Sequence, residues 1–268
     1  MKFTICLGTL RLISLAVASI SSIFAADSPE PRKLGVSRGG VIPYFVDGDG
    51  WATTFRLSCL EPQCAIEFAF VGSNGQLAPM PVTITVPDQT GETVVNATES
   101  VITLTLAQGN SVVIETQGTG SDVITGAVDV RSNQFLAGMS TFRQRVPGRP
   151  DFEAAVFMES RIVTSAFLVP FDNRAGFATG VAVTNLTNNR RVDVVVTGVD
   201  LATRTLFTGT ISLDALNGTT FDLAARFPEA AGKVGLIQLS AQGAAISGTG
   251  FRFNPTGSFS TVPIFNLQ

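Results

Sequence analysis

An internal repeat constrains the fold more than any other feature of this sequence. A Pro-aromatic step is followed by a loop rich in Asp, Gly and Asn, and then by the pattern Gly-aromatic-Ala-Thr. The two copies read Ile42-Pro43-Tyr44-Phe45, Asp47-Gly48-Asp49, Gly50-Trp51-Ala52-Thr53 and Val169-Pro170-Phe171, Asp172-Asn173, Gly176-Phe177-Ala178-Thr179. A second marker, a Gly followed 16 positions later by Phe-Arg, recurs at Gly126/Phe142-Arg143 and at Gly235/Phe251-Arg252. Self-similarity of this kind indicates that one structural unit occurs twice.

The segments between these markers have the pattern of β-strands. They alternate apolar with polar residues or are rich in β-branched residues, at 82–86, 101–106, 111–115, 181–185, 192–196, 205–213 and 236–239. Gly, Asn and Asp separate them, and the short spacing favours antiparallel pairing over alternating strands and helices. We therefore predict an all-β chain with two tandem antiparallel β-sandwich (immunoglobulin-like) domains, at 41–162 and 163–268. One short helical turn is predicted at 223–231, broken near Pro228.

The two copies differ in length. Trp51 precedes Phe142 by 91 positions, whereas Phe177 precedes Phe251 by 74, so copy one is 17 residues longer. We expect the loop from Cys59 to Cys64 to belong to this extra length. In an oxidising compartment these two cysteines predict a small disulfide ring with Pro62 favouring its turn, and a metal site is the weaker alternative.

Residues 1–25 have the three parts of a cleaved signal peptide: a basic start, an apolar stretch and small residues before a polar exit. An uncleaved anchor is the alternative, although the apolar stretch is shorter than a membrane helix needs. Residues 26–40 are predicted to be a linker. We thus expect a secreted protein, extracellular or periplasmic, with no membrane insertion after cleavage. Without residues 1–25 the chain has 16 basic and 21 acidic residues and no basic run, which argues against nucleic acid as a partner.

No catalytic constellation can be recognised in the sequence. Histidine is absent, which excludes Ser-His-Asp and Cys-His catalysis and the commonest zinc ligand. A pair of carboxylates could hydrolyse glycosides, but the neighbours Asp151 and Glu153 fit an ordinary strand edge. We therefore expect a protein that is not an enzyme and that needs no cofactor.

Two loops keep a weak calcium hypothesis open. Asp47-Gly48-Asp49-Gly50 resembles the start of a calcium loop but lacks the later acidic ligand, and Asp172-Asn173 lies at the matching place in copy two. The candidate ligands are therefore Asp47, Asp49, Asp172 and Asn173. The favoured interpretation is a glycine-rich turn that leads into a strand.

The aromatic residues of the repeat are predicted to be core positions. Phe142 and Phe251 should fill equivalent places, and the Arg after each should point away, because alternate side chains of a strand face opposite sides. The alternative for Arg252 is an exposed guanidinium that binds a carboxylate ligand. Trp51, the only Trp, is also predicted to be buried, since copy two has Phe177 at its place.

The phrases Gly176-Phe177-Ala178-Thr179-Gly180-Val181-Ala182, Arg226-Phe227-Pro228 and Gly250-Phe251-Arg252-Phe253-Asn254-Pro255 resemble a tandem immunoglobulin-like repeat of uncharacterised secreted proteins from environmental bacteria. The resemblance covers roughly residues 40–265. It implies the fold and export but no chemistry. The leading hypothesis is a secreted or cell-surface, non-enzymatic binding or adhesion module for an unknown protein or glycan ligand. The alternatives are a carbohydrate-binding or carbohydrate-active protein and a structural spacer or accessory of an envelope assembly.

Overall fold

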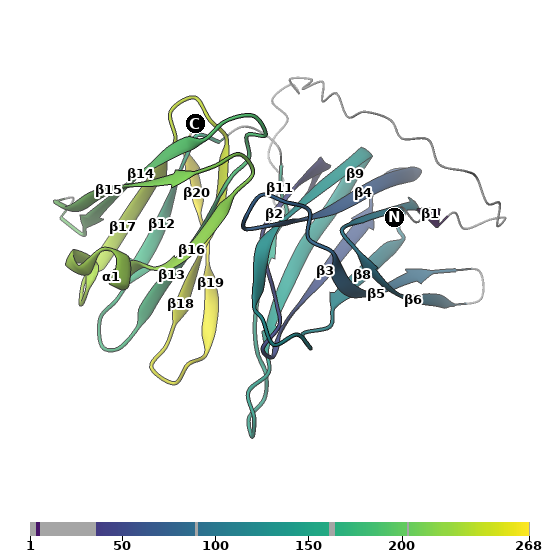
Figure 1. Ribbon diagram of the computed structural model, residues 1–268, viewed down its shortest axis with the longest axis horizontal. Helices are drawn as coiled ribbons and strands as arrows, with labels where there is room; N and C mark the ends of the chain where they lie inside the picture. Colours follow the sequence, from purple (N-terminus) through teal and green to yellow (C-terminus); the bar gives the residue numbers. More distant parts are fainter. Residues whose placement is uncertain (1–3, 6–35, 89–90, 161–163, 203, 268) are drawn as a thin grey trace.

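The structure is a computed structural model that describes residues 4–5, 36–88, 91–160, 164–202 and 204–267, most of them in β-strands (Figure 1). The strands are β1 (Thr4–Ile5), β2 (Val36–Asp47), β3 (Trp51–Cys59), β4 (Gln63–Gly72), β5 (Met80–Pro87), β6 (Glu92–Glu99), β7 (Val101–Ala107), β8 (Ser111–Thr116), β9 (Ile124–Gln144), β10 (Phe152–Phe157), β11 (Glu159–Ser160), β12 (Ala166–Asp172), β13 (Ala178–Asn185), β14 (Val192–Asp200), β15 (Thr205–Leu213), β16 (Gly218–Asp222), β17 (Val234–Ser240), β18 (Ile246–Phe253), β19 (Phe259–Val262) and β20 (Phe265–Leu267).

The helical elements are one turn, α1 (Leu223–Arg226), and a 3-10 turn, η1 (Pro228–Ala230). The predicted all-β class and the helical turn broken near Pro228 are therefore confirmed. Within the described residues, neither helical element is long and apolar enough to span a membrane.

In the N-terminal half, residues 36–160, the long strand β9 belongs to two layers. Up to Ser132 it lies between β2 and β4, and from Leu136 onwards it pairs with β3 and β10. One layer thus has the order β7, β4, β9, β2, β11, and the other has the order β6, β5, β8, β3, β9, β10. Edge-to-face contacts join the rings of Phe45, Phe55 and Phe70 in the core of this half.

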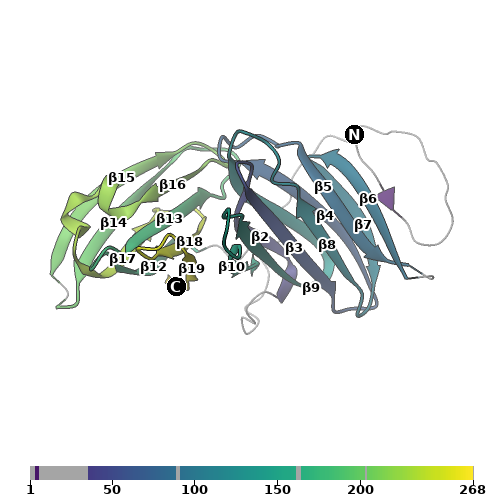
Figure 2. The same ribbon diagram turned by 90° about the horizontal axis from the view of Figure 1, so that it is seen from below.

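The C-terminal half, residues 164–267, contains two sheets with a second core (Figure 2). One sheet has the order β15, β14, β17, β12, β20, and the other has the order β16, β13, β18, β19. The fully buried side chains of Phe167, Val181, Val194 and Ile237 come from both sheets and form part of this core. The alternation of buried and exposed residues along β12 and β14 reflects one face turned inward and the other outward.

Strand pairing repeats from one half to the other. Strand β2 corresponds to β12, β3 to β13, β4 to β14, β7 to β15, β8 to β16, β10 to β19 and β11 to β20. The first part of β9 corresponds to β17, and its second part corresponds to β18. The glycine marker of each copy has the same role. A Cβ atom would lie 2.1 Å from the carbonyl oxygen of Val71 at Gly126, and 1.9 Å from that of Val199 at Gly235. Only glycine allows the neighbouring strand to approach so closely.

The extra length of copy one is the hairpin of β5 and β6, which pairs with β8 and extends its layer. The expectation that the cysteine loop forms this extra length is wrong. Residues 60–62 connect β3 to β4, and copy two has a longer connection, residues 186–191, between the corresponding strands. The predicted disulfide is confirmed, because Cys59 and Cys64 are bonded with their Cα atoms 5.7 Å apart. It closes a connection that both copies possess.

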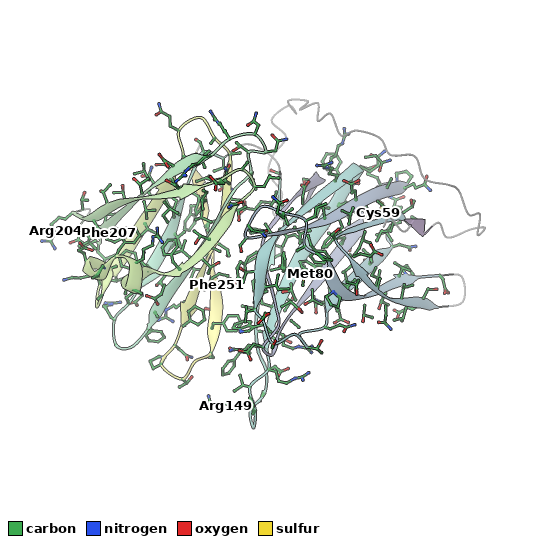
Figure 3. All side chains as sticks on the ribbon, in the orientation of Figure 1. Cys59, Met80, Arg149, Arg204, Phe207 and Phe251 are labelled. Atoms are coloured by element: carbon green, nitrogen blue, oxygen red, sulfur yellow. A yellow bond between two sulfur atoms is a disulfide. The ribbon has the colours of Figure 1, made fainter. Side chains whose placement is uncertain are left out.

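The same flank of each half is covered in two different ways. In copy one, Met80 and Val82 of the hairpin are fully buried against the core that includes Leu104 of β7. In copy two, α1 and η1 take this place, and the ring of Phe227 stacks on that of Phe207 in β15 at 4.5 Å. Figure 3 labels Met80 in the N-terminal half and Phe207 in the C-terminal half. Both solutions remove apolar side chains from water where the sheets end.

The two halves contact each other through the sheet that contains β13 and β18. Both strands are buried on both faces: Val181 and Val183 belong to the C-terminal core, whereas Ala182 and Phe251 pack into the N-terminal core. Strands β10 and β19 lie side by side at this contact (Figure 2). The hydroxyl of Thr261 also donates to the carbonyl of Ala155 at 2.7 Å. This contact is largely apolar and buries large aromatic rings.

Of the three predicted segment boundaries, only the one at 40/41 falls within the residues that the structure describes. Strand β2 begins at Val36 and so includes the last five residues of the predicted linker 26–40. Its Gly39 and Gly40 belong to the strand because β9 and β11 approach them closely, with atoms 2.5 and 2.0 Å from a notional Cβ. Of the predicted signal peptide 1–25, only Thr4 and Ile5 are described, and they pair in parallel with β7. The predicted boundary at 162/163 lies outside the described residues.

Candidate functional site

A shallow depression of about 440 Å³ opens at one end of the C-terminal half. Strands β12, β13, β17, β18 and β19 line it, together with the turn between β14 and β15. Its apolar wall comes from Pro170, Leu201, Val234, Leu236 and Val262. Leu201 is 76% exposed and Leu236 is 38% exposed, so the wall presents apolar surface directly to solvent.

Arg252 and Asp172 are the charged residues that line this depression. The guanidinium of Arg252 lies over the ring of Phe177, with its central carbon 3.7 Å from the ring centroid. Such a cation–π contact fixes the plane of the guanidinium. No hydrogen bond from this guanidinium occurs within the described part of the chain, and its nearest approach to Asp172 is 3.9 Å. Arg252 is therefore oriented while its N–H donors stay available.

A one-residue slip between the copies explains why an arginine occupies this place. Thr53 lies opposite Phe142, whereas the matching Thr179 lies opposite Arg252. Directly opposed residues share a face of the sheet, so Arg252 takes the position that Phe142 fills in copy one. The prediction that Phe142 and Phe251 fill equivalent core positions is therefore wrong, although both are buried. Copy two has a hollow where copy one has an aromatic ring.

The repeated threonine ties together the strands that carry the site. Its hydroxyl, in Thr179, accepts a hydrogen bond from the backbone N–H of Asp172 at 3.3 Å. In copy one, Thr53 accepts from the N–H of Val46 at 3.0 Å and donates to its carbonyl at 2.7 Å. The Thr of the Gly-aromatic-Ala-Thr pattern thus joins β3 to β2 in copy one and β13 to β12 in copy two. The aromatic residue two positions earlier, Trp51 or Phe177, lies at the start of β3 or directly before β13.

Asp172 is engaged mainly by Arg174. Two hydrogen bonds of 2.9 and 3.0 Å join the guanidinium of Arg174 to the two carboxylate oxygens. These bonds, with a smaller contribution from the positive charge of Arg252, lower the pKa of Asp172 from 3.8 to about 2. With one carboxylate and two guanidinium groups, this cluster has a net charge of +1.

The four calcium candidates are not brought together as a ligand set. The Oδ1 atom of Asp47 accepts from the N–H of Gly118 at 2.7 Å, and Asp49 lies in the adjoining turn with a positive φ of 51°. Asn173 is buried and donates to the carbonyl of Ala230 at 3.2 Å, while its Oδ1 has no partner within the described residues. No cluster of three or more acidic or cysteine side chains occurs among the residues that the structure describes. The calcium hypothesis stays a prediction.

The remaining candidates lie at the contact between the halves or in copy one. Trp51 is only half-buried, so the prediction of a core position was partly right, and its ring is 5.1 Å from that of Phe259. Asp151 is 3.7 Å from Arg143, and Glu153 is exposed in β10.

Comparison with protein-family models found no match, and comparison with curated proteins found no relative. Sequence reasoning had considered Arg252 but missed the depression beside it. Its wall is assembled from strands far apart in the chain, and no local pattern marks Leu201 or Leu236 as its members.

Proposed function

We propose that this chain is an exported, non-enzymatic binding module made of two immunoglobulin-like β-sandwich domains, one in each half. The repeated strand pairing supports the two-domain interpretation, and the signal-like residues 1–25 support export. The absence of histidine from the sequence and the use of both mature cysteines in a disulfide support a binding role over catalysis.

The observation that carries this proposal is the depression beside Arg252. It combines an exposed apolar wall with one oriented cation, which are the two components that small binding sites usually combine. The corresponding place in copy one is filled by Phe142, which is 1% exposed. Ligand binding is therefore proposed for the C-terminal half.

The test is a binding screen with the purified chain that lacks residues 1–25. A library of small organic acids, alcohols, amides and short peptides is screened by thermal shift, a glycan array is probed in parallel, and chromogenic glycoside and ester substrates are assayed for hydrolysis. We expect saturable binding by at least one compound class and no turnover. Turnover at a rate that survives further purification, or no binding by any class, would overturn the proposal.

Export is tested separately. The full chain is produced in a bacterium with its own N-terminus, and the N-terminal residue of the mature protein is determined from the periplasm and the medium. We expect removal of residues 1–25. A chain that retains these residues and stays in the cytoplasm would contradict export without affecting the binding proposal.

A further inference from the structure

We propose that the depression at Arg252 binds a monocarboxylate carried on an apolar group. This inference rests on the proposed binding function and assigns the ligand class of the same site. Two chemical features carry it: the charge and geometry of the guanidinium, and the apolar wall beside it.

The charge of the site favours an anion. Asp172 is hydrogen-bonded on both oxygens by Arg174, which leaves the charge of Arg252 without a hydrogen-bonded counter-ion among the described residues. The net charge of this cluster is +1, so one negative charge balances it. A planar guanidinium with unused donors matches the two oxygens of a carboxylate.

The geometry favours binding without reorganisation. Because the ring of Phe177 covers one face of the guanidinium at 3.7 Å, its N–H groups are held in one plane before a ligand arrives. The Arg252 side chain is 41% exposed, so an anion can reach it without moving the fold. Preorganisation of this kind lowers the entropic cost of binding.

The wall selects what the carboxylate is attached to. Leu201, Leu236 and Val262 line the depression with apolar atoms, and the first two are exposed in the free protein. Covering them with an apolar group removes unfavourable contact with water. Acetate lacks this group and should bind weakly. A free acid with an aromatic or branched aliphatic tail fits both features, as does the C-terminal carboxylate of a peptide that ends in an apolar residue.

The copies provide a matched control. Arg143 stands in the same Phe-Arg pair of copy one and is 46% exposed, close to the 41% of Arg252. It lies in β9, in the other half, and Asp151 is 3.7 Å from it. Arg143→Gln removes the same charge from the protein as Arg252→Gln but leaves the depression intact.

The experiment measures binding by calorimetry and by NMR chemical-shift changes in the chain without residues 1–25. The small-molecule probes are 3-phenylpropionate, 3-phenylpropionamide and acetate. The peptide probes are N-acetylated tetrapeptides that end in leucine, with a free or an amidated C-terminus. For one source or both, we expect the free carboxylate to bind about tenfold or more tightly than its amide, consistent with the strength of charged hydrogen bonds. Which source binds better identifies where the carboxylate comes from.

Three variants complete the test. Arg252→Gln should lower the affinity for the carboxylate about tenfold or more, and Arg143→Gln should leave it unchanged. Asp172→Asn should raise the affinity, because it removes the competing negative charge, an effect that a purely structural role of Arg252 would not produce. Melting temperatures and circular dichroism verify that each variant is folded.

Binding of both acid and amide with equal affinity, or binding that Arg252→Gln leaves unchanged, would overturn the ligand class while leaving the proposed binding function in place. Failure of every carboxylate probe, alongside binding of another class in the broad screen, would have the same meaning. If no class binds at all, the proposed function fails together with this inference.

Discussion

Phe142 and Phe251 follow the glycine markers of their copies at the same distance, yet they face opposite sides of their sheets and meet with ring centroids 5.9 Å apart. Phe142 faces the core of its own half, opposite Thr53, whereas Phe251 leaves its own core and packs on the other half. Tyr44 contacts both rings, at 5.4 and 5.1 Å. The two copies of the sequence repeat thus contact each other through Phe residues that are equivalent in the sequence.

This contact predicts coupled stability effects. Truncation of Phe142 or Phe251 to Ala should each lower the free energy of unfolding by about 3–5 kcal/mol, as for other buried Phe residues. In a double-mutant cycle followed by urea denaturation, we expect a coupling of about 0.5–1.5 kcal/mol, because the rings touch edge to face. Phe142→Ala combined with Phe207→Ala is the control, since these rings belong to separate core clusters and their effects should add. Additive effects for Phe142 and Phe251 would contradict the contact.

From the raised pKa of the buried Tyr44 we predict a loss of stability at alkaline pH. Burial raises the pKa of its phenol from 10.0 to about 12, and the hydrogen bond with Thr220 opposes this rise only in part. The folded state favours the neutral phenol, so this contribution is fully present below pH 10 and is lost as the pH rises to about 12. The difference corresponds to roughly 3 kcal/mol.

Because Tyr44 is the only Tyr, absorbance at 295 nm reports its ionisation directly. We expect a midpoint near pH 12 in the folded protein and near pH 10 in urea. The variant Tyr44→Phe should lack this alkaline loss of stability. A folded-state midpoint near pH 10 would show that the phenol is accessible to water.

The disulfide predicts a moderate gain in stability. Its ring is short, so the constraint that it places on the unfolded chain stabilises the fold by about 2 kcal/mol. The double variant Cys59→Ala/Cys64→Ala should therefore unfold at a lower urea concentration. Reduction of the wild-type protein provides a second measurement without a change of sequence. Equal midpoints for oxidised, reduced and double-variant proteins would contradict this contribution.

Asp172 predicts a sensitivity to acid. The hydrogen bonds from Arg174 lower its pKa to about 2, so its stabilising contribution is present above pH 4 and is lost as the pH falls through about 2. Asp172→Asn should flatten the stability profile over this acidic range. NMR titration of the side-chain carboxyl carbon measures the pKa itself, and a value near 3.8 would mean that the pair with Arg174 does not persist in solution.

The calcium hypothesis leads to an expected negative result. Asp172 already has two guanidinium partners, and Asp47 already accepts the N–H of Gly118. We therefore expect the melting temperature to be the same with and without millimolar calcium. A calcium-dependent rise that disappears in Asp47→Asn would restore the copy-one loop as a calcium site.

Local sequence patterns predicted much of the fold but little of the candidate site. The strands at 205–213 and 101–106, the helical turn near Pro228 and the disulfide could all be predicted from neighbouring residues. Alternation along a strand shows that two faces differ, but not which face meets the core when the register moves by one residue. The register of β18 differs by one residue from that of the second part of β9, which places Arg252 where copy one has Phe142. This difference could not be predicted, because both copies keep the same 16-residue spacing from Gly to Phe.

Strand β2 has a bulge at Tyr44, which is also a change of register that the sequence pattern does not reveal. Ile42 pairs with Val128 and Phe45 with Gly126, so two residues of β2 stand where β12 has only Pro170. The extra residue turns a Tyr toward the other half. Sequence comparison aligned the Pro-aromatic steps of the two copies, but only the pairing distinguishes the inserted residue from its neighbour.

The β5–β6 hairpin of copy one and the α1 and η1 turns of copy two also determine where a foreign segment could be inserted. Between β4 and β7 copy one carries a complete hairpin, and the strands on either side keep the pairing that copy two has without it. A loop graft or a reporter peptide placed between β5 and β6, away from the buried Met80 and Val82, should leave both cores undisturbed. At the matching turn between β14 and β15 a grafted hairpin would collide with α1 and η1, because Phe227 already occupies the surface of Phe207. The flank of copy one thus tolerates a longer connection between its strands, whereas α1 and η1 leave no room for one in copy two.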